Sequence, residues 1–100
     1  MARLRFAPAA ARDLQKIAED IAAAAGERTA LAFIDRLRRS LEGLADFPRM
    51  GRRRIGFGPG VRSWGLAPYV AFYREHGPDI EIIRIVHGRR KLTRQILQEG

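Results

Sequence analysis

The segment YVAFYREHGPDIEIIRIVHGRR, residues 69–90, is the stretch of this chain that decides the fold. Two stretches rich in β-branched and aromatic residues, 69–74 and 79–90, are joined by the short polar segment 75–78. This arrangement is typical of an antiparallel β-hairpin. The second stretch is apolar at both alternating positions, so we expect a strand inside a sheet with both faces covered. It ends in a basic cluster, residues 87–91, which predicts a negatively charged partner at that edge of the domain.

The residues before the hairpin indicate a short strand followed by two helices. Apolar and basic residues alternate over 3–6, as in a strand. Pro8 suits the first turn of a helix, and apolar residues at helical spacing then continue to a plausible stop at Gly26. A second apolar stripe runs from Ala30 to Leu44 and ends before Pro48. Because the link at residues 26–27 is so short, the two helices should be antiparallel neighbours.

The order of these elements predicts the fold class. Residues 61–69 have strand character, and Pro68 argues for an edge, a bulge or a turn there. Residues 49–60 are rich in arginine and glycine, and we expect a loop. The order β-α-α-β-β-β implies an α+β protein whose N-terminal helical hairpin packs on one face of a small antiparallel sheet. No linker or repeat divides the chain, so residues 1–100 are expected to form one domain.

Charge is the most unusual property of the composition. The chain has a formal net charge of +8, and arginines greatly outnumber lysines among its 19 basic residues. No acidic residue occurs between Phe47 and Arg74 or between Ile82 and Gln98. This basic second half predicts binding to an acidic protein surface or to a nucleic acid. Cysteine is absent, and no apolar run has the length of a signal peptide or a membrane span, so we expect a cytoplasmic protein without disulfides.

Four segments carry a resemblance to a known family. They are FAPAAARDLQKIAEDI (6–21), AFIDRLRRSLEGLADFPRMGRRR (32–54), YVAFYR (69–74) and EIIRIVHGRRKL (81–92). They include Asp13-Leu14 in the first helix, a Pro-x-x-Gly-Arg turn at 48–52 and an Arg-x-x-His-Gly-Arg strand end at 84–89. In this order the segments resemble the ParE/RelE superfamily of toxins from type II toxin–antitoxin systems, and they fit the ParE branch better.

The resemblance implies a toxin neutralised by a cognate ParD-like antitoxin, through which it would associate indirectly with DNA. ParE members are associated with inhibition of DNA gyrase, whereas RelE members are ribosome-dependent mRNA endonucleases. The residues expected to bind the antitoxin are Arg62, Trp64, Tyr69 and Arg74. The residues expected to bind gyrase are Arg52, Arg53, Arg54, Arg89, Arg90, Lys91 and Arg94. We expect no catalytic residue, no cofactor and no metal.

The choice between gyrase inhibitor and nuclease depends on acid–base groups. Metal-free RNA cleavage needs a base, an acid and cations near the phosphate. The cations that could converge at the sheet edge are Arg53, Arg62, Arg84 and Arg89. No tyrosine follows Tyr73, and His87 is more simply explained as a strand-end residue hydrogen-bonded to the backbone. We therefore favour a toxin that acts by protein binding. An endonuclease and a non-toxic, antitoxin-binding regulatory subunit are the alternatives.

The segment after Gly88 has two possible interpretations. Its four cations, three arginines and Lys91, lie on a stretch with few apolar residues, which favours a movable cationic tail. In the alternative, Leu92, Ile96 and Leu97 dock this segment as a short helix and the charges face water.

Overall fold

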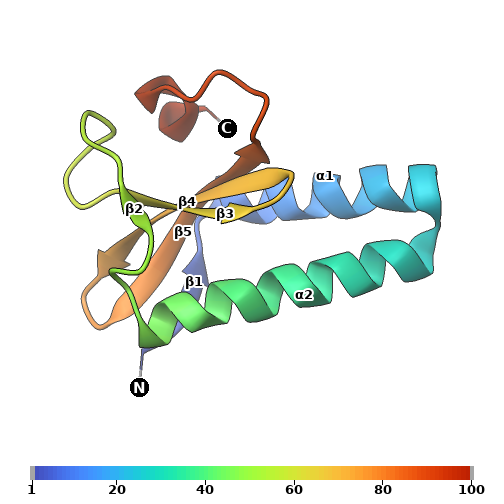
Figure 1. Cartoon of the computed structure of the whole chain (residues 1–100), viewed down its shortest axis with the longest axis horizontal. Helices are drawn as coiled ribbons and strands as arrows, with labels where there is room; N and C mark the ends of the chain where they lie inside the picture. The colour runs from blue at the N-terminus through green and yellow to red at the C-terminus, as the bar shows by residue number, and fades with distance from the viewer. Residues whose placement is uncertain (1, 100) are drawn as a thin grey trace.

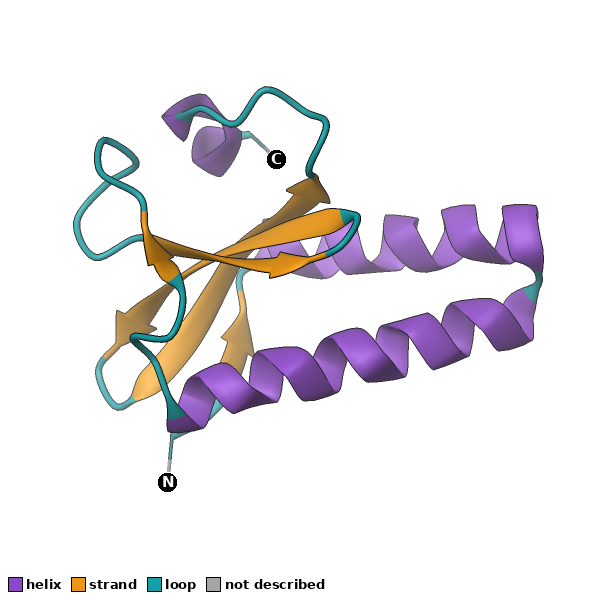
Figure 2. Cartoon of the chain, viewed as in Figure 1, coloured by secondary structure: helices purple, strands orange, loops and turns teal. Residues whose placement is uncertain are grey.

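The computed structural model describes residues 2–99, and its elements follow the predicted order with one additional strand (Figures 1 and 2). The elements are β1 (Leu4–Phe6), α1 (Pro8–Ala25), α2 (Glu27–Asp46), β2 (Arg52–Arg53), β3 (Arg62–Leu66), β4 (Tyr69–His76), β5 (Asp79–His87) and the 3₁₀-helix η1 (Arg94–Gln98). The two helices form a hairpin on one side of the sheet, and η1 lies on the other. The α+β class is confirmed.

The sheet is mixed rather than purely antiparallel, which corrects the prediction. Its strand order is β1-β5-β4-β3-β2. The β4–β5 hairpin pairs from Tyr69 with His87 to His76 with Asp79, and β5 is an interior strand, as expected. However, β1 runs parallel to β5, and β2 adds a two-residue edge strand beside β3. The direction of β1 was not predictable because it pairs with a strand more than seventy residues later in the chain.

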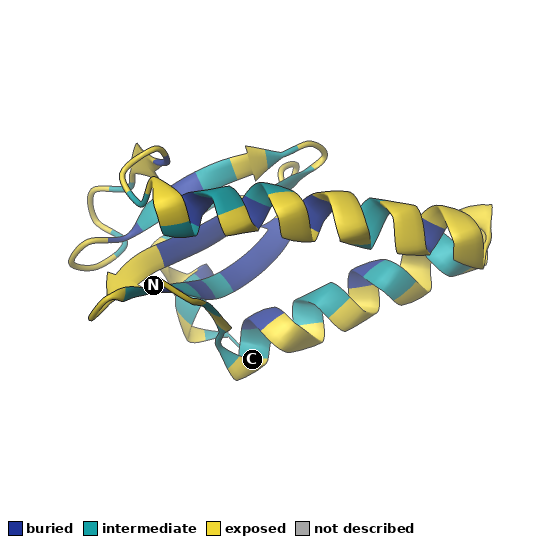
Figure 3. Cartoon of the chain, turned by 90° about the horizontal axis from the view of Figure 1, so that it is seen from below, coloured by how far each residue is buried: buried dark blue, intermediate teal, exposed yellow. Residues whose placement is uncertain are grey.

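The helix boundaries have local causes. Pro8 occupies the first turn of α1, where its missing N–H costs no hydrogen bond. Gly26 separates the helices with a φ of 93°, a left-handed conformation that favours glycine. α2 ends at Asp46, two residues before Pro48. The outer faces of both helices are largely exposed, while one stripe of each is buried (Figure 3). The predicted helical hairpin is therefore confirmed.

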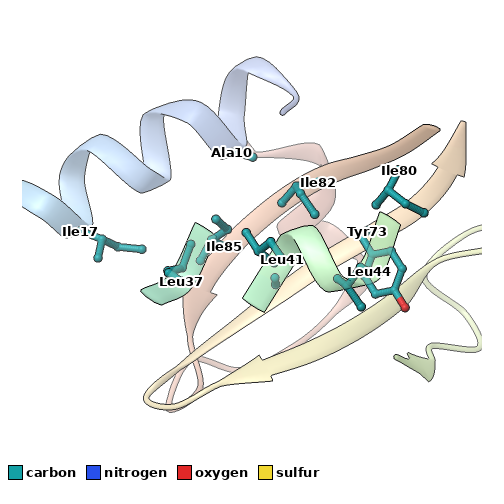
Figure 4. Close-up of a cluster of buried hydrophobic side chains, with 10 residues drawn as sticks. Ala10, Ile17, Leu37, Leu41, Leu44, Tyr73, Ile80, Ile82 and Ile85 are labelled. Atoms are coloured by element: carbon teal, nitrogen blue, oxygen red, sulfur yellow. The ribbon is translucent and has the colours of Figure 1, made fainter. Parts of the chain in front are cut away.

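The sheet separates two apolar cores. The larger one lies between the helical hairpin and the sheet, and Figure 4 shows Leu41, Leu44 and Ile82 at its centre. The smaller one lies on the opposite face and contains Phe72 and Ile96. Ile96 is only 1% exposed. The expectation that the segment after Gly88 packs poorly is thus wrong, because η1 is docked by its apolar residues.

A buried ion pair joins α1, β5 and the C-terminal segment. β1 pairs with β5 only as far as Ile82, and beyond it the backbone N–H of Ile85 donates to the Asp13 carboxylate at 2.9 Å. Arg84 donates two hydrogen bonds to Asp13, at 2.7 and 2.9 Å, and a third to the Ile96 carbonyl at 2.7 Å. The hydrogen bond to Asp13 is the main reason that the pKa of Arg84 is raised. Arg84 therefore has a structural role and does not belong to the predicted surface cluster of cations.

Candidate partner-binding surfaces

Tyr73 holds the turn between α2 and β2 in place. Its side chain is fully buried, and its hydroxyl accepts a hydrogen bond from the Gly51 N–H at 2.8 Å and donates one to the Pro48 carbonyl at 2.9 Å. A Cβ on Gly51 would lie 2.6 Å from a Tyr73 ring carbon and 2.7 Å from the Ser63 carbonyl oxygen. Glycine is therefore required in the Pro-x-x-Gly-Arg motif by the close approach of a buried ring, a cause that the sequence does not reveal.

The turn leads into an exposed basic edge strand. Arg52 and Arg53 of β2 are exposed, whereas Arg54 is half-buried. The Nε of Arg54 donates to Ser63 Oγ at 2.7 Å, and its guanidinium carbon lies 5.8 Å from the centroid of the Phe72 ring. The pKa of Arg54 is lowered, first by burial and then by the positive charge of Arg52. The positive charges of Arg52 and Arg54 are therefore close enough to affect each other.

Large apolar side chains are exposed beside these arginines. Phe47 and Met50 are 66% and 46% exposed, and they help to line an open hollow at residues 46–50. Ile55, at the start of the glycine-rich loop, is 88% exposed. We call Phe47, Arg49, Met50, Arg52, Arg53 and Ile55 the β2 edge surface. The apolar half of this surface was not predicted, because the sequence pattern does not distinguish exposed turn residues from core residues.

The predicted antitoxin-binding residues lie in three different environments. Trp64 and Tyr69 are half-buried against α2, where the indole N–H donates to Ser40 Oγ at 3.0 Å and the Tyr69 ring lies 5.7 Å from that of Phe33. Phe33 and Ser40 also line a hollow between α2 and the β3–β4 turn, together with Arg36, Leu37, Leu66 and Ala67.

The other two predicted antitoxin-binding residues are arginines that already have partners. Arg62 donates to the Gly51 carbonyl at 2.9 Å and to the Arg49 carbonyl at 3.3 Å. Arg74 forms an exposed ion pair with Glu81 at 3.1 Å. Only Trp64 and Tyr69 are therefore brought together, beside the α2 hollow.

The cations after β5 form a group separate from β2. Arg89, Lys91 and Arg94 are exposed, and Arg90 forms an ion pair with Glu99. The sheet register gives the distance between the two groups. Across the sheet Arg53 is level with Arg62, Tyr73 and Ile82, and Ile82 lies five residues before His87, after which the second group begins. At about 3.4 Å per residue, the two groups are roughly 17 Å apart along the strands. The predicted convergence of Arg53, Arg62, Arg84 and Arg89 is therefore wrong.

His87 is bonded to the backbone, as predicted. Its Nδ1 accepts the N–H of Arg89 at 3.0 Å, and its ring lies 5.6 Å from that of Tyr69. Across residues 2–99, no group of three or more His, Cys, Asp and Glu side chains is placed to hold a metal ion. None of the helices in the same range is long and apolar enough to cross a membrane.

The fold and the basic surfaces define a small α+β protein of the kind found as the toxin of type II toxin–antitoxin systems. A family model described as "ParE toxin of type II toxin-antitoxin system, parDE" matches residues 4–92, and the chain belongs to this family. It is 34% identical over 84 residues to Toxin ParE3 of Caulobacter vibrioides, covering 84% of each chain. It also resembles a structure titled "Chromosomal ParDE TA system from P. aeruginosa", with a TM-score of 0.75 and 29% identity, over 87% of this chain and 96% of that one. The resemblance to the ParE branch is confirmed.

Proposed function

We propose that this ParE toxin inhibits DNA gyrase by binding to it and is held inactive by a cognate ParD-like antitoxin. The observation that carries the proposal is the family match over residues 4–92, which includes every strand and both long helices. The toxin needs no catalytic group of its own in this function, since binding alone would block the target.

The antitoxin is expected to cover the hollow beside α2. A segment with acidic and apolar residues that folds on binding would cover the half-buried rings of Trp64 and Tyr69. Its carboxylates would bind Arg62 and Arg74. Arg74 already forms a surface ion pair with Glu81, and exposed pairs of this kind contribute at most about 1 kcal/mol. Apolar burial should therefore supply most of the affinity. DNA association would follow through the antitoxin.

The surfaces expected to meet gyrase are the two cationic groups. One contains Arg52, Arg53 and Arg54, and the other contains Arg89, Arg90, Lys91 and Arg94. Arginine side chains are suited to such contacts because their planar guanidinium groups bind carboxylates or phosphates through two hydrogen bonds.

A second function is favoured by one contact. Tyr69 and His87 are neighbours at the strand end that precedes Arg89, and a tyrosine, a histidine and a cation are groups that RNA cleavage can use. However, Arg84 is held by Asp13, and the β2 arginines lie far along the sheet. This site therefore has fewer cations available to bind a phosphate than the sequence predicts. For this reason the endonuclease is only the second candidate function.

Two assays on the purified chain separate these functions. The first measures supercoiling by DNA gyrase, and the second measures ribosome-dependent cleavage of mRNA. We expect inhibition of supercoiling, reversed by the ParD-like antitoxin, and no cleavage. Cleavage of mRNA that is lost in a folded His87→Ala variant, with supercoiling unaffected, would establish the endonuclease instead.

A further inference from the structure

The β2 edge surface combines three features that occur together nowhere else in residues 2–99. The first is unpaired positive charge. Arg5, Arg39, Arg74 and Arg90 each form an ion pair, whereas none is formed by Arg49, Arg52 or Arg53 within the described residues. No acidic residue separates these three arginines in the sequence. A carboxylate-bearing partner would therefore find cations that are not already neutralised.

The second feature is exposed apolar area next to that charge. Four large apolar side chains are exposed in the described residues, and Phe47, Met50 and Ile55 belong to this surface. Arginine, methionine and aromatic residues together are the composition enriched in the buried centres of protein–protein interfaces. Binding to a nucleic acid backbone needs the arginines but has little use for these apolar side chains. The composition therefore favours a protein over DNA or RNA.

The third feature is an unpaired strand edge. β2 is the last strand of the sheet, and the Arg54 N–H donates to the Val61 carbonyl at 3.0 Å. Hydrogen-bonding residues alternate along an antiparallel ladder, so the N–H and carbonyl of Arg53 face away from β3. An extended segment can add to such an edge through its backbone. Tyr73 fixes the adjoining turn, which holds the edge ready for a partner.

We propose that the β2 edge surface is the docking site for an extended segment of the inhibited protein, with acidic and apolar side chains, added as a strand beside β2. This inference rests on the proposed function, since it assigns one of the two cationic groups as the primary target contact. Carboxylates of the segment bind Arg49, Arg52 and Arg53, and its apolar side chains cover Phe47, Met50 and Ile55.

Three sets of variants test the three features. Phe47→Ser/Met50→Ser removes apolar side chains, and Arg52→Glu/Arg53→Glu reverses the charge. Arg53→Pro removes the backbone N–H that faces away from β3 and leaves the hydrogen bonds between β2 and β3 in place. Arg53→Ala is its matched control, because it removes the same side chain but keeps the N–H. The controls are Leu31→Ser, which is 66% exposed like Phe47 but about 24 Å away along α2, and Arg28→Glu/Arg38→Glu on the helical hairpin. Melting temperatures confirm that each variant is folded.

Growth arrest on induced expression and inhibition of purified gyrase are measured for every variant. We expect both double variants to need at least about tenfold more protein for half-inhibition, as for central interface residues, and both controls to stay near the parent. Arg53→Pro should be weaker than Arg53→Ala. Folded double variants that arrest growth like the parent would overturn the docking site.

The remaining outcomes separate the two proposals. A parent that arrests growth without affecting gyrase, together with inactive double variants, refutes the gyrase target but supports the docking site. Loss of activity in the charge variant alone, with Phe47→Ser/Met50→Ser fully active, identifies a nucleic acid contact and overturns the protein segment. A parent that neither arrests growth nor inhibits gyrase overturns both proposals.

Discussion

Asp13→Ala should be one of the most destabilising single substitutions in this chain. The side chains of Asp13 and Arg84 are 16% and 9% exposed, so removal of the carboxylate leaves a mostly buried guanidinium whose remaining counter-charge is the more distant, partly exposed carboxylate of Glu99 at 3.5 Å. Breaking a buried pair in this way costs about 3–5 kcal/mol. The Ile96 carbonyl still accepts from Arg84, which favours the lower end of that range, but the Ile85 N–H also loses its acceptor. We therefore expect a loss of about 3 kcal/mol or more.

Urea unfolding followed by circular dichroism gives the free energy of unfolding directly. Asp35→Ala is the matched control, because Asp35 forms an exposed ion pair with Arg39 at 2.7 Å and its loss should cost no more than about 0.5 kcal/mol. Adding Arg84→Met to Asp13→Ala should recover part of the loss, since the mostly buried guanidinium charge is then gone. A loss below about 1 kcal/mol for Asp13→Ala would refute the conclusion that the Asp13–Arg84 ion pair stabilises the packing of α1 on β5.

Four further predictions concern other parts of the molecule. Tyr73→Phe leaves the Gly51 N–H and the Pro48 carbonyl without their partner, so we expect a loss of about 1–3 kcal/mol in urea unfolding; a loss near zero would mean that water replaces the hydroxyl. Burial raises the pKa of Tyr73 above its ordinary 10.0, so its contribution to stability is complete below pH 10 and is lost as the pH rises through the folded-state pKa; the parent should therefore destabilise relative to Tyr73→Phe only above pH 10, and parallel profiles would contradict this. Ile96→Ala should lower the free energy of unfolding by about 2–5 kcal/mol, because Ile96 is buried, and a melting curve would detect this loss. An unchanged curve would support the interpretation of this segment as a movable tail. His87→Ala should leave growth arrest intact in a folded protein, because a toxin that acts by binding does not use the ring for chemistry.

Much of the fold was predictable from local pattern. The helical hairpin depends on two apolar stripes at helical spacing with Gly26 and Pro48 at their ends, and these signals lie within a few residues of the structure they cause. The β4–β5 hairpin was equally clear, because a short polar turn joins two strand-forming stretches. The parallel direction of β1 and the two-residue β2 were missed, since both depend on pairing partners elsewhere in the chain rather than on their own composition.

The binding surfaces were predictable only in part. The acid-free stretches correctly located the exposed cations of β2, because charge is a property of the residues themselves. Burial and pairing are properties of neighbours. Arg84 therefore proved to be a buried partner of Asp13, although its sequence context resembles that of the exposed arginines. The same reason explains why Phe47 and Met50 are exposed beside β2 although their side chains are apolar.

The sequence by itself determined the helices and the longer strands, their order, the excess of positive charge and the family. Each of these depends on local periodicity, on composition or on motifs read in order along the chain. The tertiary structure alone decided which arginines are available to a partner, why Gly51 must lie against Tyr73, and that η1 docks on the sheet. The physical reason is that these features arise from contacts between residues that are distant in the sequence, and such contacts exist only after the chain has folded.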